Sequence, residues 1–413
     1  MTTRAVNFPL MDSIRGIALL SVIAAHTAFF VDQSGQEALT KVRFDFGVRV
    51  FFIISAFLLY RPFVRSRLGA YDPPDLKAFG WRRLLRIAPA YWTALTVVVL
   101  WLGLPAVFSA TGIPIYYGFG QIYWAEKAVG GLPQAWSVCV EVVFYALLPV
   151  IAAVMRRLRA PDARRCLLQE LWMAALVFAG GLAYKLSIVQ AGTLEDPDLV
   201  VLQLNLLAFL DDFALGMALA ALSVWYEGRD RLPRPLRLLD RFPSIAWLLA
   251  LAALWVVSTQ LGLTGQLGEP VARSAYLERH YLFSVLALGL VLPAMFGNPA
   301  RGLVRRILAN RVMLYLGMVS YAVYLYHFAV LIQLERWGFT EFAEDTTAWL
   351  WFPAALGGGV LVATASWYLI ERPFLRLKRL VPTRAEPAAG ELVIEPGPVA
   401  AGGPKAAPGR PAG

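Results

Sequence analysis

Long apolar runs separated by short basic loops make up most of the chain. Each run is roughly 20 residues long, the length that an α-helix needs to cross the hydrocarbon core of a bilayer. Several runs are apolar on every face, as expected of helices that contact lipid. We therefore expect an all-α fold, a polytopic membrane helix bundle with about ten transmembrane helices. The predicted spans are residues 9–31, 46–64, 89–108, 136–155, 169–189, 200–224, 244–262, 280–297, 313–334 and 347–371.

Positively charged residues are distributed unevenly between the loops on the two sides of these spans. Of the 38 Lys and Arg residues, 29 lie in the two termini and in alternate loops, six lie in the other loops and three lie inside spans. Cytoplasmic loops of membrane proteins carry an excess of basic residues. The distribution supports ten spans and predicts that both termini are cytoplasmic.

The composition agrees with a membrane protein. Apolar residues make up 58% of the 413 residues and charged residues only 16%, against about 25% charged residues in soluble domains. This excludes a typical cytosolic enzyme, a disordered protein and a fibrous protein. A net charge of +10 would indicate a nucleic-acid partner in a soluble protein. Here the positive charge lies mainly in loops that would set the orientation of the protein in the membrane. We therefore expect the lipid bilayer as a partner and no nucleic acid.

Two segments are predicted to lie outside the membrane. We expect residues 109–135 to form an outer loop. Alternatively, part of this loop could re-enter the membrane. Residues 381–413 are rich in Ala, Pro and Gly, which indicates a disordered cytoplasmic tail. We therefore expect one folded transmembrane domain at residues 1–380.

Ionisable side chains inside apolar spans are energetically costly and indicate function. Arg15 and His26 both lie in the first span, and their spacing puts them on one helical face, separated along the axis by roughly 16 Å. Asp12, one turn before Arg15, predicts an ion pair with it. Alone, Arg15 could anchor the helix at the inner surface and His26 could be an interfacial residue. As an aligned pair they favour a functional role.

Two further ionisable residues are predicted in the outer halves of their spans. Glu141 lies early in the fourth span, and its short side chain reaches water poorly, which favours a buried role. His327 lies in the ninth span, where the sequence supports a functional role and a structural hydrogen bond to a neighbouring helix equally.

The basic loop before the third span contains Arg83 and Arg86, which would share a helical face. Guanidinium groups match the geometry of phosphates. Membrane topology alone could also require these charges, so their spacing does not decide between the two roles.

Several other polar residues receive no role from the sequence. Arg49, Asp211 and Asp212 are unassigned, and His280 at a span edge is expected to be structural. Cys139 and Cys166 are not expected to pair. We predict no metal site, because no cluster has the spacing of metal ligands, and no nucleotide-binding motif occurs.

Taken together, these residues resemble the acyltransferase 3 family of integral-membrane acyltransferases. The first matching stretch has the spacing of the family's Arg-x10-His motif, and the third contains its Arg-x-x-Arg pair. The matching stretches, in family order, are Asp12 to Ala18 with His26, Gly47 to Leu58, Arg82 to Pro89, Trp136 to Glu141, Ser320 to His327, and Glu371 to Pro373. The chain departs from the family at Ala56, where Gly is common, and at Arg49, where an acidic or neutral residue is frequent.

The resemblance implies transfer of an acyl group, above all acetyl, from cytoplasmic acyl-CoA to a hydroxyl group. Acyl-CoA is then a co-substrate, and no permanently bound cofactor is expected. In this mechanism His26 is the general base for the acceptor hydroxyl. Glu141 orients His26 or stabilises its imidazolium, and His327 or a backbone N–H stabilises the oxyanion. We expect direct transfer rather than an acyl-enzyme.

The resemblance also implies a donor site on the inner side of the membrane. The arginines there would bind the CoA phosphates, and the pantetheine arm is long enough to bridge the gap from Arg15 to His26. The residues expected to bind substrate or CoA are Asp12, Arg15, Arg83, Arg86, Trp136, Ser320 and Tyr324.

The sequence leaves the acceptor and one other class of function open. The acceptor could be a sugar of an envelope glycan, a glycolipid or a macrolide-type product. The main alternative to an enzyme is a proton-coupled transporter that exports a small or lipidic solute, although no internal repeat of the kind common in transporters is evident. In either case we expect a multi-pass protein of the bacterial plasma membrane.

Overall fold

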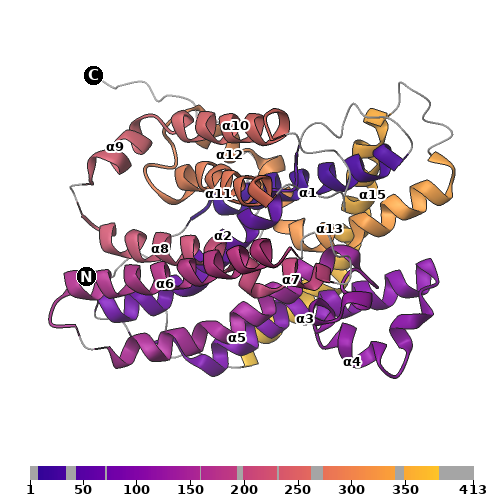
Figure 1. The fold of residues 1–413 in the computed structure, drawn as a ribbon, viewed down its shortest axis with the longest axis horizontal. Helices are drawn as coiled ribbons and strands as arrows, with labels where there is room; N and C mark the ends of the chain where they lie inside the picture. The colour runs from indigo at the N-terminus through magenta and orange to yellow at the C-terminus, as the bar shows by residue number, and fades with distance from the viewer. Residues whose placement is uncertain are drawn as a thin grey trace, which may run out of the picture.

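The structure, a computed structural model, describes residues 8–33, 43–69, 72–158, 160–192, 199–229, 232–261, 273–339 and 348–380. All the regular structure in these residues is helical (Figure 1). This confirms the predicted all-α fold. The predicted tail at 381–413 lies outside the described residues.

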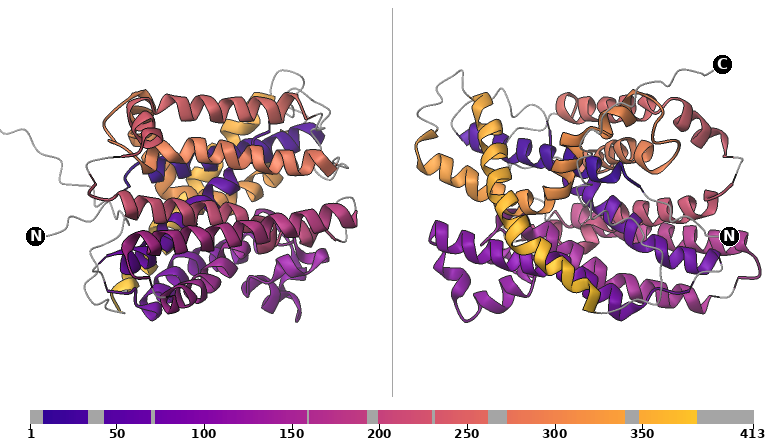
Figure 2. Two further views of the ribbon diagram at one scale, coloured as in Figure 1. Left: turned by 60° about the vertical axis from the view of Figure 1, so that its left-hand side comes forward. Right: turned by 180° about the vertical axis from the view of Figure 1, so that it is seen from behind.

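The long helices run side by side and form one bundle (Figure 2). They are α1 (Met11–Gln33), α2 (Gly47–Leu68), α3 (Leu76–Leu102), α5 (Trp136–Arg157), α6 (Ala163–Ala191), α8 (Leu210–Tyr226), α10 (Ser244–Thr259), α11 (Arg273–Met295), α13 (Arg311–Arg336) and α15 (Ala348–Ser366). Shorter elements are η2 (Pro105–Phe108), α4 (Gly112–Tyr117), η3 (Gln121–Tyr123), η4 (Ala125–Lys127), η5 (Pro133–Ala135), α7 (Val200–Gln203), η8 (Leu206–Phe209), α9 (Arg234–Arg241), α12 (Leu303–Leu308), a π-helical turn η9 (Trp367–Glu371), α16 (Arg372–Arg376) and η10 (Leu377–Leu380).

The helices account for the predicted membrane spans. Among the described residues, nine helices are long and apolar enough to cross a membrane, and a tenth crossing is formed if α9 and α10, which meet at a bend of 91°, are counted together. α10 corresponds to the predicted span 244–262 and has 16 residues. The protein is therefore a polytopic helix bundle with nine or ten crossings in the part of the chain that the structure describes.

The basic loop predicted between the second and third spans, residues 65–88, is mostly helical where the structure describes it. α2 continues to Leu68, and α3 begins at Leu76 rather than at residue 89. The Asp75 side chain caps α3 by accepting hydrogen bonds from the backbone N–H groups of Lys77 and Ala78, at 2.8 and 3.3 Å. Such a cap satisfies the free donors at a helix start, so the helix extends through the arginines before it becomes apolar.

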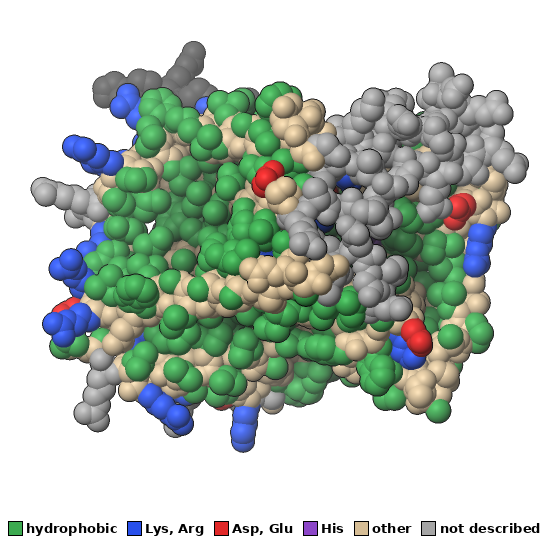
Figure 3. Space-filling model, viewed as in Figure 1, with side chains coloured by type: hydrophobic (Ala, Val, Ile, Leu, Met, Phe, Trp, Pro, Cys, Tyr) green, Lys and Arg blue, Asp and Glu red, His purple; other side chains and the backbone are tan. Residues whose placement is uncertain are grey.

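The outer surface of the bundle suits a lipid environment. Apolar side chains cover most of the described part of the face shown in Figure 3, and Lys and Arg gather at the end where α9 lies. Leu361 and Leu369, for example, are each 75% exposed. In water such a surface would be unstable, whereas in a bilayer it contacts lipid tails.

The segment predicted as the outer loop 109–135 folds into short helices against the end of α3. The Tyr91 hydroxyl donates to the carbonyl of Tyr116 at 2.9 Å, and the Trp92 indole N–H donates to that of Tyr117 at 2.8 Å. Ile122 is buried as well. The segment is therefore a compact cap on the bundle, and its last turn, η5, leads directly into α5.

Close helix contacts depend on small residues. A Cβ atom at Gly317 of α13 would overlap the backbone carbonyl of Asp12 in α1, and one at Gly216 of α8 would overlap the carbonyl of Ile53 in α2. Glycine lets two helix backbones approach in this way inside a membrane. The contact at Gly317 sets the spacing between α1 and α13, the two helices that carry the histidines described below.

We expect Gly317→Ala to destabilise the protein by about 1–3 kcal/mol, the usual cost of overpacking, because the backbone of α1 cannot move away cheaply. Gly357→Ala in α15 is the control, since a Cβ there meets open space. Thermal unfolding in detergent should show a lower melting temperature for the first variant only. Equal melting temperatures would contradict the close contact.

Candidate active site

Two histidines from different helices form a hydrogen-bonded pair in the bundle. His26 Nδ1 on α1 lies 2.8 Å from His327 Nε2 on α13, and the rings stack with centroids 5.1 Å apart. His327 is fully buried, whereas His26 is partly exposed. The sequence predicted both residues as candidates but did not predict that they touch.

Backbone carbonyls fix the positions of the protons in this pair. His327 Nδ1 lies 2.8 Å from the carbonyl oxygen of Tyr324 and 3.3 Å from that of Val323. Carbonyl oxygens only accept hydrogen bonds, so Nδ1 of His327 carries the proton and its Nε2 is an acceptor in the neutral ring. His26 must then donate through Nδ1, which leaves a lone pair on its Nε2. That nitrogen is the one available to take a proton from a substrate.

Glu141 occupies a different place from the predicted one. Its carboxylate accepts hydrogen bonds from Ser55 at 2.8 Å and from Tyr145 at 2.9 Å. In the part of the chain that the structure describes, no hydrogen bond joins it to His26. The hydrogen-bond partner of His26 among the described residues is His327, and the orienting role expected of Glu141 stays a prediction. Tyr145, one turn after Glu141, could have been found from the i,i+4 spacing; Ser55 comes from another helix and could not.

The second predicted role of His327, stabilising an oxyanion, also does not fit this geometry. One ring nitrogen faces the two carbonyls and the other faces His26. Neither nitrogen is left to donate to a substrate oxygen. A histidine has only two polar atoms, and here both are committed to contacts within the protein.

The arginines that were predicted to bind CoA lie on α1 and α3. Arg15 forms the predicted ion pair with Asp12, with Nη1 and Oδ1 3.2 Å apart. Arg86 lies close enough to Glu141 and to Glu371 to interact electrostatically with both, and Arg15 lies within that range of Glu141. Glu141 also lies within that range of Tyr324, whose carbonyl contacts His327. Glu141 is therefore near both the arginines and the part of α13 that carries His327.

Three other predicted substrate-binding residues have structural contacts. Trp136 stacks on Phe209, with ring centroids 5.3 Å apart. The Ser320 hydroxyl donates to the carbonyl of Gly317 in its own helix, at 2.8 Å. The Tyr324 hydroxyl donates to the carbonyl of a residue in η5 at 2.5 Å. Tyr324 thus contacts His327 through its backbone carbonyl, and its side chain holds the turn η5 against α13.

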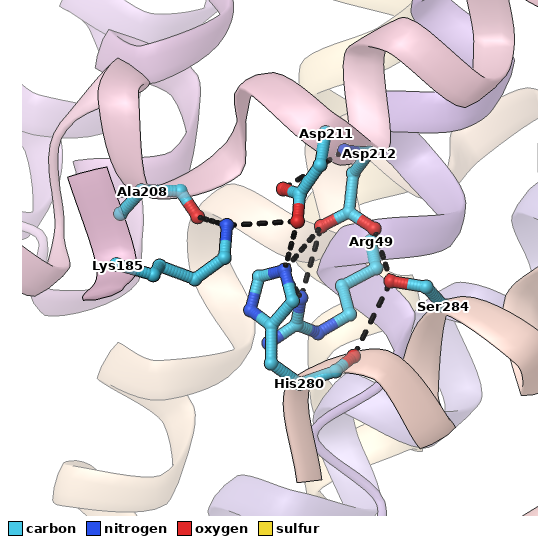
Figure 4. A network of polar contacts seen from close by, with 7 residues as sticks. All are labelled: Arg49, Lys185, Ala208, Asp211, Asp212, His280 and Ser284. Carbon is cyan, nitrogen blue, oxygen red and sulfur yellow. Dashed lines mark hydrogen bonds and ion pairs between the residues drawn. The ribbon is translucent and has the colours of Figure 1, made fainter. Parts of the chain in front are cut away.

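The sequence missed a buried charge cluster formed by side chains of α2, α6, α8 and α11 (Figure 4). Arg49 of α2 donates to Asp212 at 2.9 Å, and Lys185 of α6 lies 2.8 Å from Asp211. His280 of α11 lies 2.9 Å from Asp211 and 3.0 Å from Arg49. His280 is thus part of a charged network instead of an isolated structural residue at a span edge. The one sequence feature that could have revealed the cluster is that these residues lie at similar predicted depths in the membrane.

This charge cluster balances its own charge. Two cationic side chains face two carboxylates, and Ser284 donates to Asp212 at 2.8 Å. The Lys185 and Asp211 side chains are both fully buried. Asp211, Asp212 and His280 place ligand atoms within 4.8 Å of one another. However, the lysine and the arginine already bind the carboxylate oxygens, so we assign the cluster no metal and interpret it as a contact between α2, α6, α8 and α11.

The two cysteines are in different helices. Cys139 lies on α5 and Cys166 on α6, and both are buried and free. This confirms the prediction that they do not pair.

Residues 9–369 match the Acyl_transf_3 family, described as an acyltransferase domain. The chain therefore belongs to the acyltransferase 3 family, and it is a multi-pass membrane acyltransferase rather than the transporter considered as the alternative.

Similar proteins include Nodulation protein 10 of Rhizobium leguminosarum bv. viciae, which is 26% identical over 80% of this chain and 82% of its own length. Acyltransferase MdmB of Streptomyces mycarofaciens is 25% identical over 95% of this chain and 98% of its own length. A putative O-acetyltransferase of Staphylococcus aureus (strain COL) is 24% identical over 78% of this chain, and the match covers 50% of that protein. No solved structure matches the chain significantly.

We expect Lys185→Met to lower the stability by roughly 3–5 kcal/mol, because removing one partner of a buried pair leaves an uncompensated charge. The double variant Lys185→Met/Asp211→Asn restores the charge balance and should recover most of the loss. Arg301→Met removes an ion pair in which the arginine is 57% exposed, and it should cost about 1 kcal/mol or less. Thermal unfolding in detergent measures all three. A double variant no more stable than Lys185→Met would contradict the charge-balance interpretation.

Proposed function

We propose that this protein is an O-acyltransferase that moves an acyl group, with acetyl as the expected group, from acyl-CoA to a hydroxyl group. The acceptor is a sugar, a glycolipid or a macrolide-type molecule. The observation that carries the proposal is the hydrogen bond from His26 to His327, because it leaves His26 Nε2 with a lone pair inside a membrane-embedded acyltransferase.

The proton transfers balance with His26 as the general base. His26 Nε2 takes the proton of the acceptor hydroxyl while the hydroxyl oxygen attacks the thioester carbonyl carbon. The C–S bond then breaks, and the CoA thiolate takes the proton from His26. His327 accepts the hydrogen bond from His26 Nδ1–H throughout. The carbonyls of Tyr324 and Val323, which accept from His327, stabilise the positive charge that develops on the pair. The group that orients the base is therefore a second histidine, whose own N–H is held by two backbone carbonyls. His327 takes the place that the carboxylate has in a Ser-His-Asp triad.

The donor would bind along α1. Arg15, Arg83 and Arg86 offer guanidinium groups for the CoA phosphates, and His26 lies roughly 16 Å farther along the helix axis than Arg15. The pantetheine arm spans such a gap and would bring the thioester to the histidine pair. In this arrangement, Glu141 belongs to the donor region and balances the charge of Arg15 and Arg86.

The names of the relatives support this reaction class, since one is a putative O-acetyltransferase and another an acyltransferase. We further propose the bacterial plasma membrane as the location. The end of the bundle that gathers Lys and Arg would face the cytoplasm (Figure 3). Acyl-CoA would then enter from that end.

We expect His26→Gln to reduce acyl transfer about 100- to 10,000-fold, the usual contribution of a general base. The assay follows alkali-labile label transferred from radiolabelled acetyl-CoA to membranes that contain the protein. Thr27→Val is the matched control from the same turn of α1, because Thr27 is 1% exposed and its hydroxyl has no partner among the described residues. It should keep full transfer. Full transfer by His26→Gln would refute the proposed base.

We expect the double variant Arg83→Gln/Arg86→Gln to raise the apparent KM for acetyl-CoA about tenfold or more, because each lost charged hydrogen bond is worth about 1.5–3 kcal/mol. The kcat should change less, since these residues lie away from the reacting atoms. Lys77→Gln, at an exposed position of α3, should leave both constants unchanged. An unchanged KM in the double variant would remove the phosphate-binding role.

A further inference from the structure

We propose that Gln134 is a positioning residue for the reaction, and that it acts by holding the carbonyl groups that orient His327. This inference rests on the proposed function of the His26–His327 pair and deepens it. Gln134 belongs to the cap formed by residues 109–135 and lies in η5, immediately before α5. Within the described part of the chain it forms no hydrogen bond with either histidine, so its effect must pass through α13.

The side chain of Gln134 binds two carbonyl groups of α13. Its Nε2 donates to the carbonyl oxygen of Leu325 at 2.8 Å and to that of Tyr324 at 3.1 Å. Only the NH2 end of an amide can donate to a carbonyl, so these contacts determine which way the amide points. Gln134 is 2% exposed, so water does not compete for these bonds.

One of these carbonyls is the group that holds His327. The Tyr324 oxygen accepts a hydrogen bond from His327 Nδ1 at 2.8 Å as well as the one from Gln134. Tyr324 lies inside α13, so its oxygen also faces the backbone N–H four residues on, and the two side-chain donors share this acceptor with the helix. Gln134 therefore restrains the acceptor that keeps the proton on Nδ1 of His327.

The contact between the cap and α13 is reciprocal. The Tyr324 hydroxyl donates to the backbone carbonyl of Gln134 at 2.5 Å, and the Ser137 hydroxyl lies 2.7 Å from the same hydroxyl. The Gln134 side chain binds the Tyr324 backbone, and the Tyr324 side chain binds the Gln134 backbone. Two such bonds between the same two residues restrict both the turn and the helix.

The chemical consequence concerns the tautomer of the pair. If His327 lost its hold on the carbonyl and carried its proton on Nε2, it would donate to His26 Nδ1. His26 would then hold its own proton on Nε2, and no lone pair would face the acceptor hydroxyl. By restraining the Tyr324 carbonyl, Gln134 favours the tautomer in which His26 can act as the base.

Gln121 provides a matched control within the same cap. It is also fully buried, it also lies in a short 3-10 turn, and both glutamines have an Oε1 atom without a partner among the described residues. Its Nε2 donates to the Tyr91 hydroxyl at 3.3 Å, on α3 rather than α13. A general effect of removing a buried amide should therefore appear at both positions, whereas an effect on His327 should appear only at Gln134.

The experiment compares Gln134→Met with Gln121→Met, using radiolabelled acetyl-CoA and membranes that contain the full chain. We expect Gln134→Met to lower kcat about tenfold, as loss of an orienting hydrogen bond would, with the KM for acetyl-CoA unchanged. Gln121→Met should keep kcat within about threefold of the parent protein, because it has no contact with the carbonyl that orients His327. Gln134→Leu, which has no polar atom and therefore cannot donate, should behave like Gln134→Met and replaces it if that variant does not fold.

A double-mutant cycle tests whether Gln134 acts through His327. In a His327→Gln background, Gln134→Met should cause no further loss, because residues that act as a unit are not additive. Equal losses in both backgrounds, or full kcat in Gln134→Met while His327→Gln is impaired, would overturn the inference and leave the proposed function standing. Full transfer by both His26→Gln and His327→Gln would instead overturn the proposed function, and the positioning role with it.

Discussion

The hydrogen bond between His26 and His327 depends on two backbone carbonyls of α13 that lie inside the bundle. Within a membrane, each buried polar group must find its partner in the protein. The Tyr324 and Val323 carbonyls meet this need by accepting from His327, and His327 in turn accepts from His26. The need of buried polar groups for hydrogen-bond partners stabilises the fold. It also determines which nitrogen of His26 keeps a lone pair.

The same requirement shapes the rest of the bundle. Glu141 is satisfied by two hydroxyl groups, and Asp211 and Asp212 by side chains from α2, α6 and α11 (Figure 4). The charge cluster binds α2 to α6, α8 and α11, while Ser55 on the same α2 binds Glu141 on α5. α2 is thus the helix that connects the charge cluster to Glu141. Neighbouring α1 carries both Arg15 and His26.

Several residues of the candidate site could be singled out from the sequence for physical reasons. Ionisable side chains in apolar spans are rare, so His26, His327 and Arg15 could be singled out before any fold was known. The ion pair of Arg15 with the preceding aspartate followed from helical spacing alone. The start of α3 was placed too late because hydropathy marks the apolar part of a helix, and the cap at Asp75 lies well before that part. His280 was underestimated because a residue at a span edge shows nothing of the helices that pack around it.

Local hydropathy and the rare charges within it were enough to define the class of fold, the approximate number of apolar helices and the residues that could carry chemistry. Which of those residues meet depended on tertiary packing. Gln134 and Tyr324 lie 190 positions apart in the chain, and His26 and His327 lie 301 apart. No local pattern encodes such contacts, since they arise from how α1, η5 and α13 pack. That packing makes His327, and not Glu141, the partner of His26.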